Sequence, residues 1–120
     1  MKTLIVSAVL LLAPLAAHAD CNPRDFAIKD FHPGFNSMGS TMRISLRGEL
    51  VNNCAAPSAA QVRVDVKDAD GKVLQSKQGW PAGTSNIAPG SAVNFDLGRL
   101  FRYESGMSSF TVSIVEVRTW

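Results

Sequence analysis

Apolar and polar residues alternate through residues 41–53 with a period of two. The apolar side of this alternation carries Met42, Ile44, Leu46 and Leu50. The polar side carries Thr41, Arg43, Ser45, Arg47 and Glu49. Because successive side chains of a strand point to opposite faces, the pattern predicts a β-strand with one face in a core and the other in water.

Two other stretches alternate in the same way. Their apolar sides carry Val62, Val64 and Val66 in residues 59–67, and Val93, Phe95 and Leu97 in residues 92–97. Residues 72–77 follow an Asp70-Gly71 pair, and Asp-Gly between two such runs indicates a hairpin. In residues 109–120 the apolar face changes between Ile114 and Val115. That change indicates a β-bulge or a strand covered on both faces.

The remaining segments are less regular. Residues 26–31 suit an irregular first strand, and Pro33-Gly34 with residues 36–40 should break the chain. We expect Phe35 and Met38 in that loop to pack over one end of the core. Residues 100–103 could form a short strand or a helical turn. Six or seven short strands without helical periodicity predict an all-β fold, an antiparallel β-sandwich of about seven strands.

The first residues have the features of a secretory signal peptide. Lys2 precedes an apolar run over residues 4–15, and Ala17-His18-Ala19 forms a small-x-small cleavage site. The apolar run is too short to span a bilayer stably. Residues 1–19 are therefore expected to be removed, leaving residues 20–120 as one periplasmic or secreted domain with no membrane anchor. A lipid on Cys21 is the alternative, and it is disfavoured because Asp20 stands where a small residue is needed.

Cys21 and Cys54 are the two cysteines of the chain. In an oxidising compartment they are expected to form one structural disulfide. On the chain-entropy account such a bridge stabilises the fold by roughly 3–4 kcal/mol. The alternative is a redox-active pair, but the spacing lacks the Cys-x-x-Cys arrangement that lowers a thiol pKa.

Charge and candidate chemistry give little support to an enzyme. The formal net charge is +2 and the signs are interspersed, which argues against a nucleic-acid partner. Asp65, Asp68 and Asp70 form a carboxylate cluster, but Lys72 follows where a calcium loop needs acidic ligands, so a turn capped by Asp side chains is expected. His32 has no second histidine or thiol to make a metal or nucleophile site. We expect no catalytic residue, no metal and no cofactor.

The hydroxyl and basic residues of the chain offer two further candidate sites. The serines of residues 105–109 lack the Gly-x-Ser-x-Gly context of a strained nucleophile turn. Basic residues lie on the polar sides of two predicted strands: Arg43, Arg47, Arg63 and Lys67. Because acidic residues are interleaved with them, they mainly suit solvated strand faces. A patch for an anionic polymer is the alternative.

Trp80, Phe35 and Trp120 are the candidate partner contacts. Trp80 lies in a Gly-Trp-Pro-Ala-Gly loop, where an indole either caps the sandwich or anchors a partner. Trp120 either packs on the last strand or is exposed. The sequence leaves both alternatives open.

Several motifs together resemble the FxLYD family of exported bacterial domains. They are Gly-Glu-Leu-Val-Asn-Asn (48–53), Val-Arg-Val-Asp-Val (62–66), Asp-Ala-Asp-Gly-Lys-Val (68–73), Ser-Asn-Ile-Ala-Pro-Gly (85–90) and Phe95. The resemblance covers residues 41–120 and implies an immunoglobulin-like β-sandwich without a catalytic site. The stretch that names the family would fall on residues 64–68, where only Asp68 keeps its letter and Lys67 replaces an aromatic residue.

These observations favour a non-enzymatic binding or accessory module, whose partner is another protein received by loops or by an unpaired strand edge. The alternative is an inhibitor or immunity-type protein that blocks an exported enzyme. In that case Trp80 or the segment 31–38 would insert into a cleft.

Overall fold

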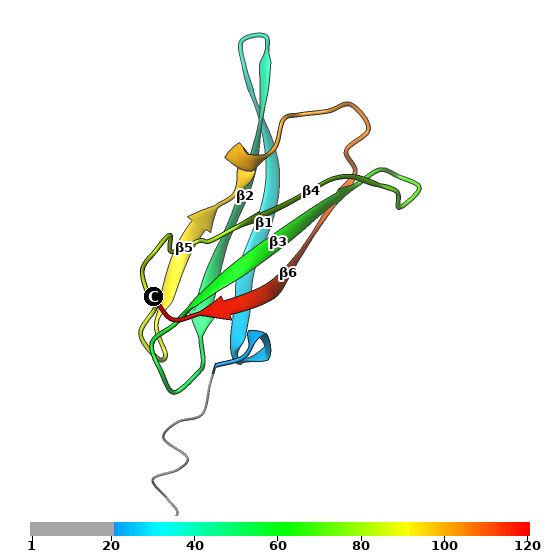
Figure 1. Ribbon diagram of the computed structural model, residues 1–120. Coiled ribbons are helices and arrows are strands. Elements are labelled where there is room, and N and C mark those ends of the chain that lie inside the picture. The colour runs from blue at the N-terminus through cyan, green and yellow to red at the C-terminus, as the bar shows by residue number, and fades with distance from the viewer. Residues whose placement is uncertain (1–20) are drawn as a thin grey trace, which may run out of the picture.

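The computed structural model describes residues 21–120, and the expected signal peptide, residues 1–19, lies outside this part. Six strands form two antiparallel three-stranded sheets, as Figure 1 shows. The strands are β1 (Phe26–Met38), β2 (Thr41–Asn52), β3 (Ala59–Lys67), β4 (Val73–Gly79), β5 (Ala92–Asp96) and β6 (Ser109–Arg118). Two 3-10 turns accompany them, η2 (Pro23–Asp25) and η3 (Gly98–Leu100). The sheet orders β1-β2-β5 and β4-β3-β6 confirm the all-β class and are consistent with a β-sandwich.

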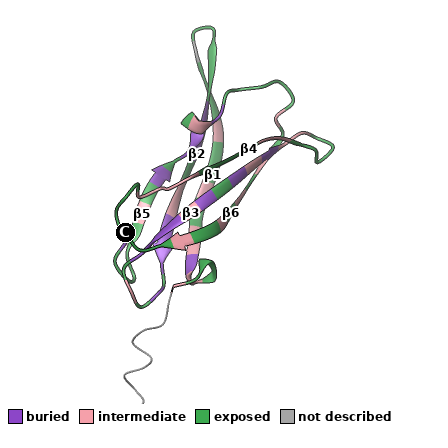
Figure 2. Ribbon diagram, in the orientation of Figure 1, coloured by how far each residue is buried: buried purple, intermediate pink, exposed green. Residues whose placement is uncertain are grey.

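The core lies between the central strands of the two sheets. Leu46 and Leu50 of β2 are fully buried. So are the three alternating valines of β3, Val62, Val64 and Val66. Figure 2 shows the buried positions concentrated on these strands, while the outer ends of the sheets are exposed. The two-residue alternation therefore identified the core face of each central strand correctly, because alternate side chains point to opposite faces.

The expected strand count of about seven was wrong by one among the described residues. Residues 98–100 form η3, and residues 101–108 contain no strand. Gly98 lies directly against the backbone of Ile44, so closely that a Cβ there would collide with the Ile44 carbonyl oxygen. The chain then continues toward β4, where the Gln75 amide donates to the Arg102 carbonyl at 3.0 Å. This segment therefore meets β4 through a side-chain hydrogen bond and not through backbone strand pairing.

The predicted break at Pro33-Gly34 was also wrong. β1 continues to Met38, and a tight turn at Gly39, with φ of 66°, leads into β2. Pro33 is tolerated because β1 is an edge strand, and its missing N–H would face away from β2. The irregularity of this strand is a bulge between Lys29 and His32, where Asp30 has φ of 52°.

The change of apolar face in the last strand corresponds to a β-bulge. Gln61 of β3 pairs with Glu116, while the next residue, Val62, pairs with Ile114. Val115 is therefore the extra residue on β6. One of the two predicted explanations is confirmed.

The end of the molecule that holds Cys21 and Asn52, here called the closed end, is tied by a disulfide and by buried hydrogen bonds. Cys21 and Cys54 form the expected bridge, with their Cα atoms 5.7 Å apart. The sulfur of Cys21 is thereby not free to carry a lipid. Asn52 is fully buried, and its Nδ2 donates to the carbonyls of Ala56 at 3.0 Å and Ile87 at 2.7 Å. Its Oδ1 accepts from the Cys54 N–H at 2.7 Å.

Within residues 21–120, no helix is long and apolar enough to cross a membrane.

Candidate functional site

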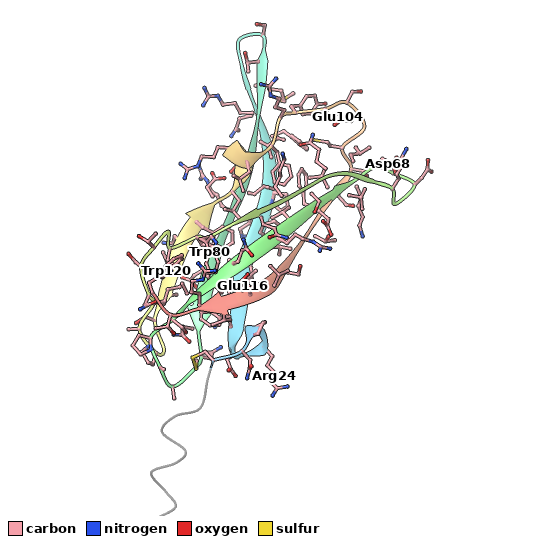
Figure 3. The ribbon with its side chains drawn as sticks, viewed as in Figure 1. Arg24, Asp68, Trp80, Glu104, Glu116 and Trp120 are labelled. Atoms are coloured by element: carbon pink, nitrogen blue, oxygen red, sulfur yellow. A yellow bond between two sulfur atoms is a disulfide. The ribbon has the colours of Figure 1, made fainter. Side chains whose placement is uncertain are left out.

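The structure separates the three predicted partner contacts into two groups. Trp80 and Trp120 lie side by side at the closed end (Figure 3), with ring centroids 5.5 Å apart in an edge-to-face arrangement. The guanidinium of Arg118 lies 5.4 Å from the Trp80 ring centroid and 4.9 Å from that of Trp120. Phe35 lies elsewhere, in the part of β1 that leads to the hairpin turn.

Most polar groups of the Trp80–Arg118–Trp120 cluster already have partners within the chain. Asn86 accepts from the backbone N–H of Trp120 at 3.0 Å, and Arg118 also pairs with Glu116 at 3.3 Å. Trp80 is half-buried and Trp120 is 44% exposed. Arginine over an aromatic face is itself a stabilising contact. The cluster therefore holds the last residues of β6 against the loop that contains Trp80 and Asn86.

Phe35 belongs to an aromatic cluster at the opposite end. Its ring lies 5.6 Å from Tyr103 and 5.8 Å from Phe110, centroid to centroid. Phe35 and Tyr103 are 43% and 44% exposed, so the expectation that Phe35 packs over the core is only partly met. The side chain of Met38 lies outside the described part of the structure. We call this region the hairpin end: residues 33–45 of β1 and β2 together with residues 98–103.

A groove of about 900 Å³ opens at the hairpin end, between β2 and the segment after β5. Four arginines line it: Arg43, Arg47, Arg99 and Arg102. Aromatic and apolar side chains contribute the rest of one wall: Met42, Phe101 and Tyr103. We call this feature the arginine groove.

Three of these four arginines have no acidic partner. Arg47 pairs with Asp96, with 3.5 Å between Nε and Oδ2. Of the ion pairs in residues 21–120, none includes Arg43, Arg99 or Arg102. The groove therefore carries a net positive charge, which attracts anionic groups.

Asp96 fixes the geometry at the base of the groove. Its Oδ1 accepts from the backbone N–H groups of Leu46 and Gly98, each at 2.9 Å. Partial burial alone would raise the pKa of Asp96, but these two bonds, with contributions from Arg47 and Ser45, lower it below its ordinary value. Asp96 stays charged at neutral pH and holds the end of β5 on β2.

Beyond this carboxylate, one backbone edge of β2 is unpaired. β5 pairs with β2 only over Arg47–Val51, and the Leu97 N–H then donates to the Leu46 carbonyl at 3.0 Å. Backbone groups of alternate residues in a strand point to the same side. The N–H and C=O of Met42 and the N–H of Ile44 therefore point away from β1, toward the arginine groove, where no described strand meets them.

The aspartates at the far turn are structural. Asp68 Oδ1 accepts from the N–H groups of Asp70 and Lys72, both at 2.9 Å, as expected for a capped turn. A hydrogen bond from Ser76 at 2.6 Å, followed by one from Arg63, lowers the pKa of Asp65. Within residues 21–120 no three His, Cys, Asp or Glu side chains gather as a metal site would require.

Sequence reasoning identified Arg43 and Arg47 but missed Arg99 and Arg102. The two pairs are far apart in the sequence and meet only because η3 returns to β2 at Gly98. It also gave no special role to Asn52 or Asp96. An Asn at the end of an apolar run, two residues before a cysteine, was the available signal for Asn52.

The chain matches no protein-family model, and it has no significant match among curated proteins or solved structures. The resemblance to the FxLYD family stays a prediction.

Proposed function

We propose that this chain is an exported, non-enzymatic binding or accessory module with an immunoglobulin-like sandwich, and that its partner is another protein. The signal peptide motif and the disulfide support export. The proposal includes membership of the FxLYD family, whose exported domains have no catalytic site.

One observation carries the proposal: the hairpin end has three arginines without an acidic partner and an unpaired strand edge, beside two aromatic rings that are 43% and 44% exposed. Arginine and aromatic residues are enriched in the energetic centres of protein interfaces. In contrast, the arginine of the closed end, Arg118, pairs with Glu116 and lies over the rings of Trp80 and Trp120. The hairpin end is therefore the proposed partner surface, with Phe35 as one contact, while Trp80 and Trp120 act mainly in stability.

Site-specific photo-crosslinking in the native host tests this function. A benzophenone amino acid replaces Met42, which is 38% exposed at the arginine groove. The matched control carries the same group in place of Arg24, an exposed residue of η2 at the other end (Figure 3). We expect discrete adducts with one protein from position 42 and none from position 24. No adduct from position 42, or the same adducts from both positions, would contradict the proposal.

One structural feature favours the alternative function, an inhibitor of an exported enzyme. The segment 31–38 lies in a hairpin that extends past the rest of the two sheets (Figure 1). A projecting hairpin can enter the cleft of an enzyme. If the partner captured at position 42 is an enzyme, adding the purified protein should reduce its turnover. Unchanged turnover at saturating protein would leave the accessory role and exclude inhibition.

A further inference from the structure

We propose that the arginine groove receives an extended segment of a partner protein, in which acidic and apolar residues alternate, as an added strand on the free edge of β2. This inference rests on the proposed function and specifies the chemistry of the partner. The added strand would continue the position of β5 in the sheet. It would pair with residues 41–44 and stop at the Ile44 carbonyl, against which Gly98 already lies, a span of about 13 Å at about 3.3 Å a residue.

The backbone of β2 supplies the main attachment. The Met42 N–H and C=O and the Ile44 N–H face the groove, and β5 ends before reaching them. Adding a strand to a free sheet edge gives affinity through main-chain hydrogen bonds, while alternate side chains give specificity. The Asp96 carboxylate already substitutes for a strand at Leu46. The partner strand would therefore begin beyond Leu46, at the Ile44 N–H, and continue toward Met42.

The two sides of the groove differ, and this difference sets the sequence of the partner. Arg43, Ser45 and Arg47 lie on the outer face of β2, which was predicted as its polar side. Met42, Phe101 and Tyr103 lie toward the inner face, next to the Phe35 aromatic cluster. A strand on this edge would place alternate residues against each side. Acidic residues would face Arg43, and apolar residues would face Tyr103.

A second copy of this chain is a poorer occupant. Pairing β2 with β2 across this edge would bring the Arg43 side chains of two copies close together, and like charges opposite one another are destabilising. Charged residues beside an open edge also discourage self-association. A partner with negative charges meets neither penalty.

The test uses fluorescein-labelled peptides of about eight residues, long enough to cover residues 41–44 with a margin. The probe alternates Glu and Val, and its matched control alternates Lys and Val. Two further Glu-Val peptides carry N-methyl groups on one or the other alternate set of amides. An added strand donates to β2 through only one set, so methylation of that set should weaken binding by more than about tenfold. Methylation of the other set should change binding by less than about twofold.

Two variants assign the binding to the groove. Arg43→Ser with Arg99→Ser should weaken binding of the Glu-Val peptide by about tenfold, because each exposed charge pair contributes modestly. The matched control is Arg24→Ser, which removes the same charge at the closed end and should leave binding unchanged. Met42→Pro removes one edge N–H that is not part of the β1 ladder. It should fold, as checked by circular dichroism, and should lose binding. The methylated peptides test the same point without altering the protein.

Three results would overturn the inference. The first is equal binding of the Glu-Val and Lys-Val peptides, and the second is equal binding of both methylated peptides. The third is that the native chain binds no peptide while the Arg43→Ser, Arg99→Ser variant self-associates. In the second case the groove would bind anions by charge alone. If any of these results accompanies specific crosslinking at position 42, the proposed function stands and only the mode of binding fails. If crosslinking also fails, the proposed function falls with it.

Discussion

The two ends of the molecule use similar residue types in different ways. At the closed end, the amide of buried Asn52 makes three hydrogen bonds, and Arg118 lies over two tryptophan rings. At the hairpin end, Arg43 has no acidic partner, and the backbone edge at Met42 is open. Groups that satisfy one another stabilise the fold, whereas groups left unsatisfied are available for binding. The difference indicates that stability and recognition are located at opposite ends of the two sheets.

The largest expected effect comes from Asn52→Ala. It would leave the buried Cys54 N–H without its acceptor and remove one of the two donors to the Ile87 carbonyl, which keeps the Ser58 N–H at 3.2 Å. We expect the free energy of unfolding to fall by about 3–5 kcal/mol, measured by urea titration. The matched change is Asn36→Ala at the exposed hairpin end, where we expect a shift within about 0.5 kcal/mol. Equal losses from the two variants would remove the contrast between the ends.

Removal of the disulfide should have a slightly smaller effect. Cys21→Ser with Cys54→Ser opens a link with a sequence separation of 33, which should cost roughly 3–4 kcal/mol of unfolding free energy. Binding of the Glu-Val peptide, measured well below the unfolding transition, should not change. A parallel loss of peptide affinity in the folded double variant would show that the two ends are coupled.

The aromatic residues of the two ends should separate stability from binding. Trp120→Ala removes an edge-to-face contact with Trp80 and a cation–π contact with Arg118, and should lower unfolding free energy by about 1–2 kcal/mol. Phe35→Ala should lower it by about 0.5–1.5 kcal/mol. Only Phe35→Ala should also weaken crosslinking at position 42. Reduced crosslinking in both variants would assign the partner surface to both ends.

The smallest effect concerns pH. Because the pKa of Asp96 is lowered in the folded chain, its carboxylate stabilises the fold fully above its unfolded pKa of about 3.9. This contribution is lost as the pH falls through the lower folded pKa. The Asp96 side chain is 44% exposed, so the effect should stay below about 1 kcal/mol. Unfolding free energy of Asp96→Asn should therefore fall less steeply below about pH 4 than that of the native chain. Parallel curves would contradict this role.

Features that depend on neighbouring residues were predictable from the sequence. The alternation around Leu46 and Val64 identified the central strands, because one face of each is buried. The bulge at Val115 was visible as a change of apolar face. The disulfide followed from having two cysteines in an expected exported chain, and the cap at Asp68 followed from turn chemistry.

Features that depend on the meeting of distant segments were not predictable. Pro33 looked like a break, but an edge strand without a neighbour on its outer side tolerates it. The segment after Gly98 could not be placed, since its path is set by contact with Ile44. The same contact brings Arg99 and Arg102 to Arg43. The arginine groove is thus a consequence of tertiary structure rather than of a local motif.

Amide hydrogen exchange, followed by NMR, tests the open edge of β2 most directly. In the free protein, the Met42 and Ile44 amides should exchange rapidly, while those of Arg43 and Ser45, which face β1, should be protected. Saturation with the Glu-Val peptide should protect Met42 and Ile44 and leave the other two unchanged. Protection of Met42 and Ile44 before the peptide is added, or their continued rapid exchange at saturation, would contradict the account.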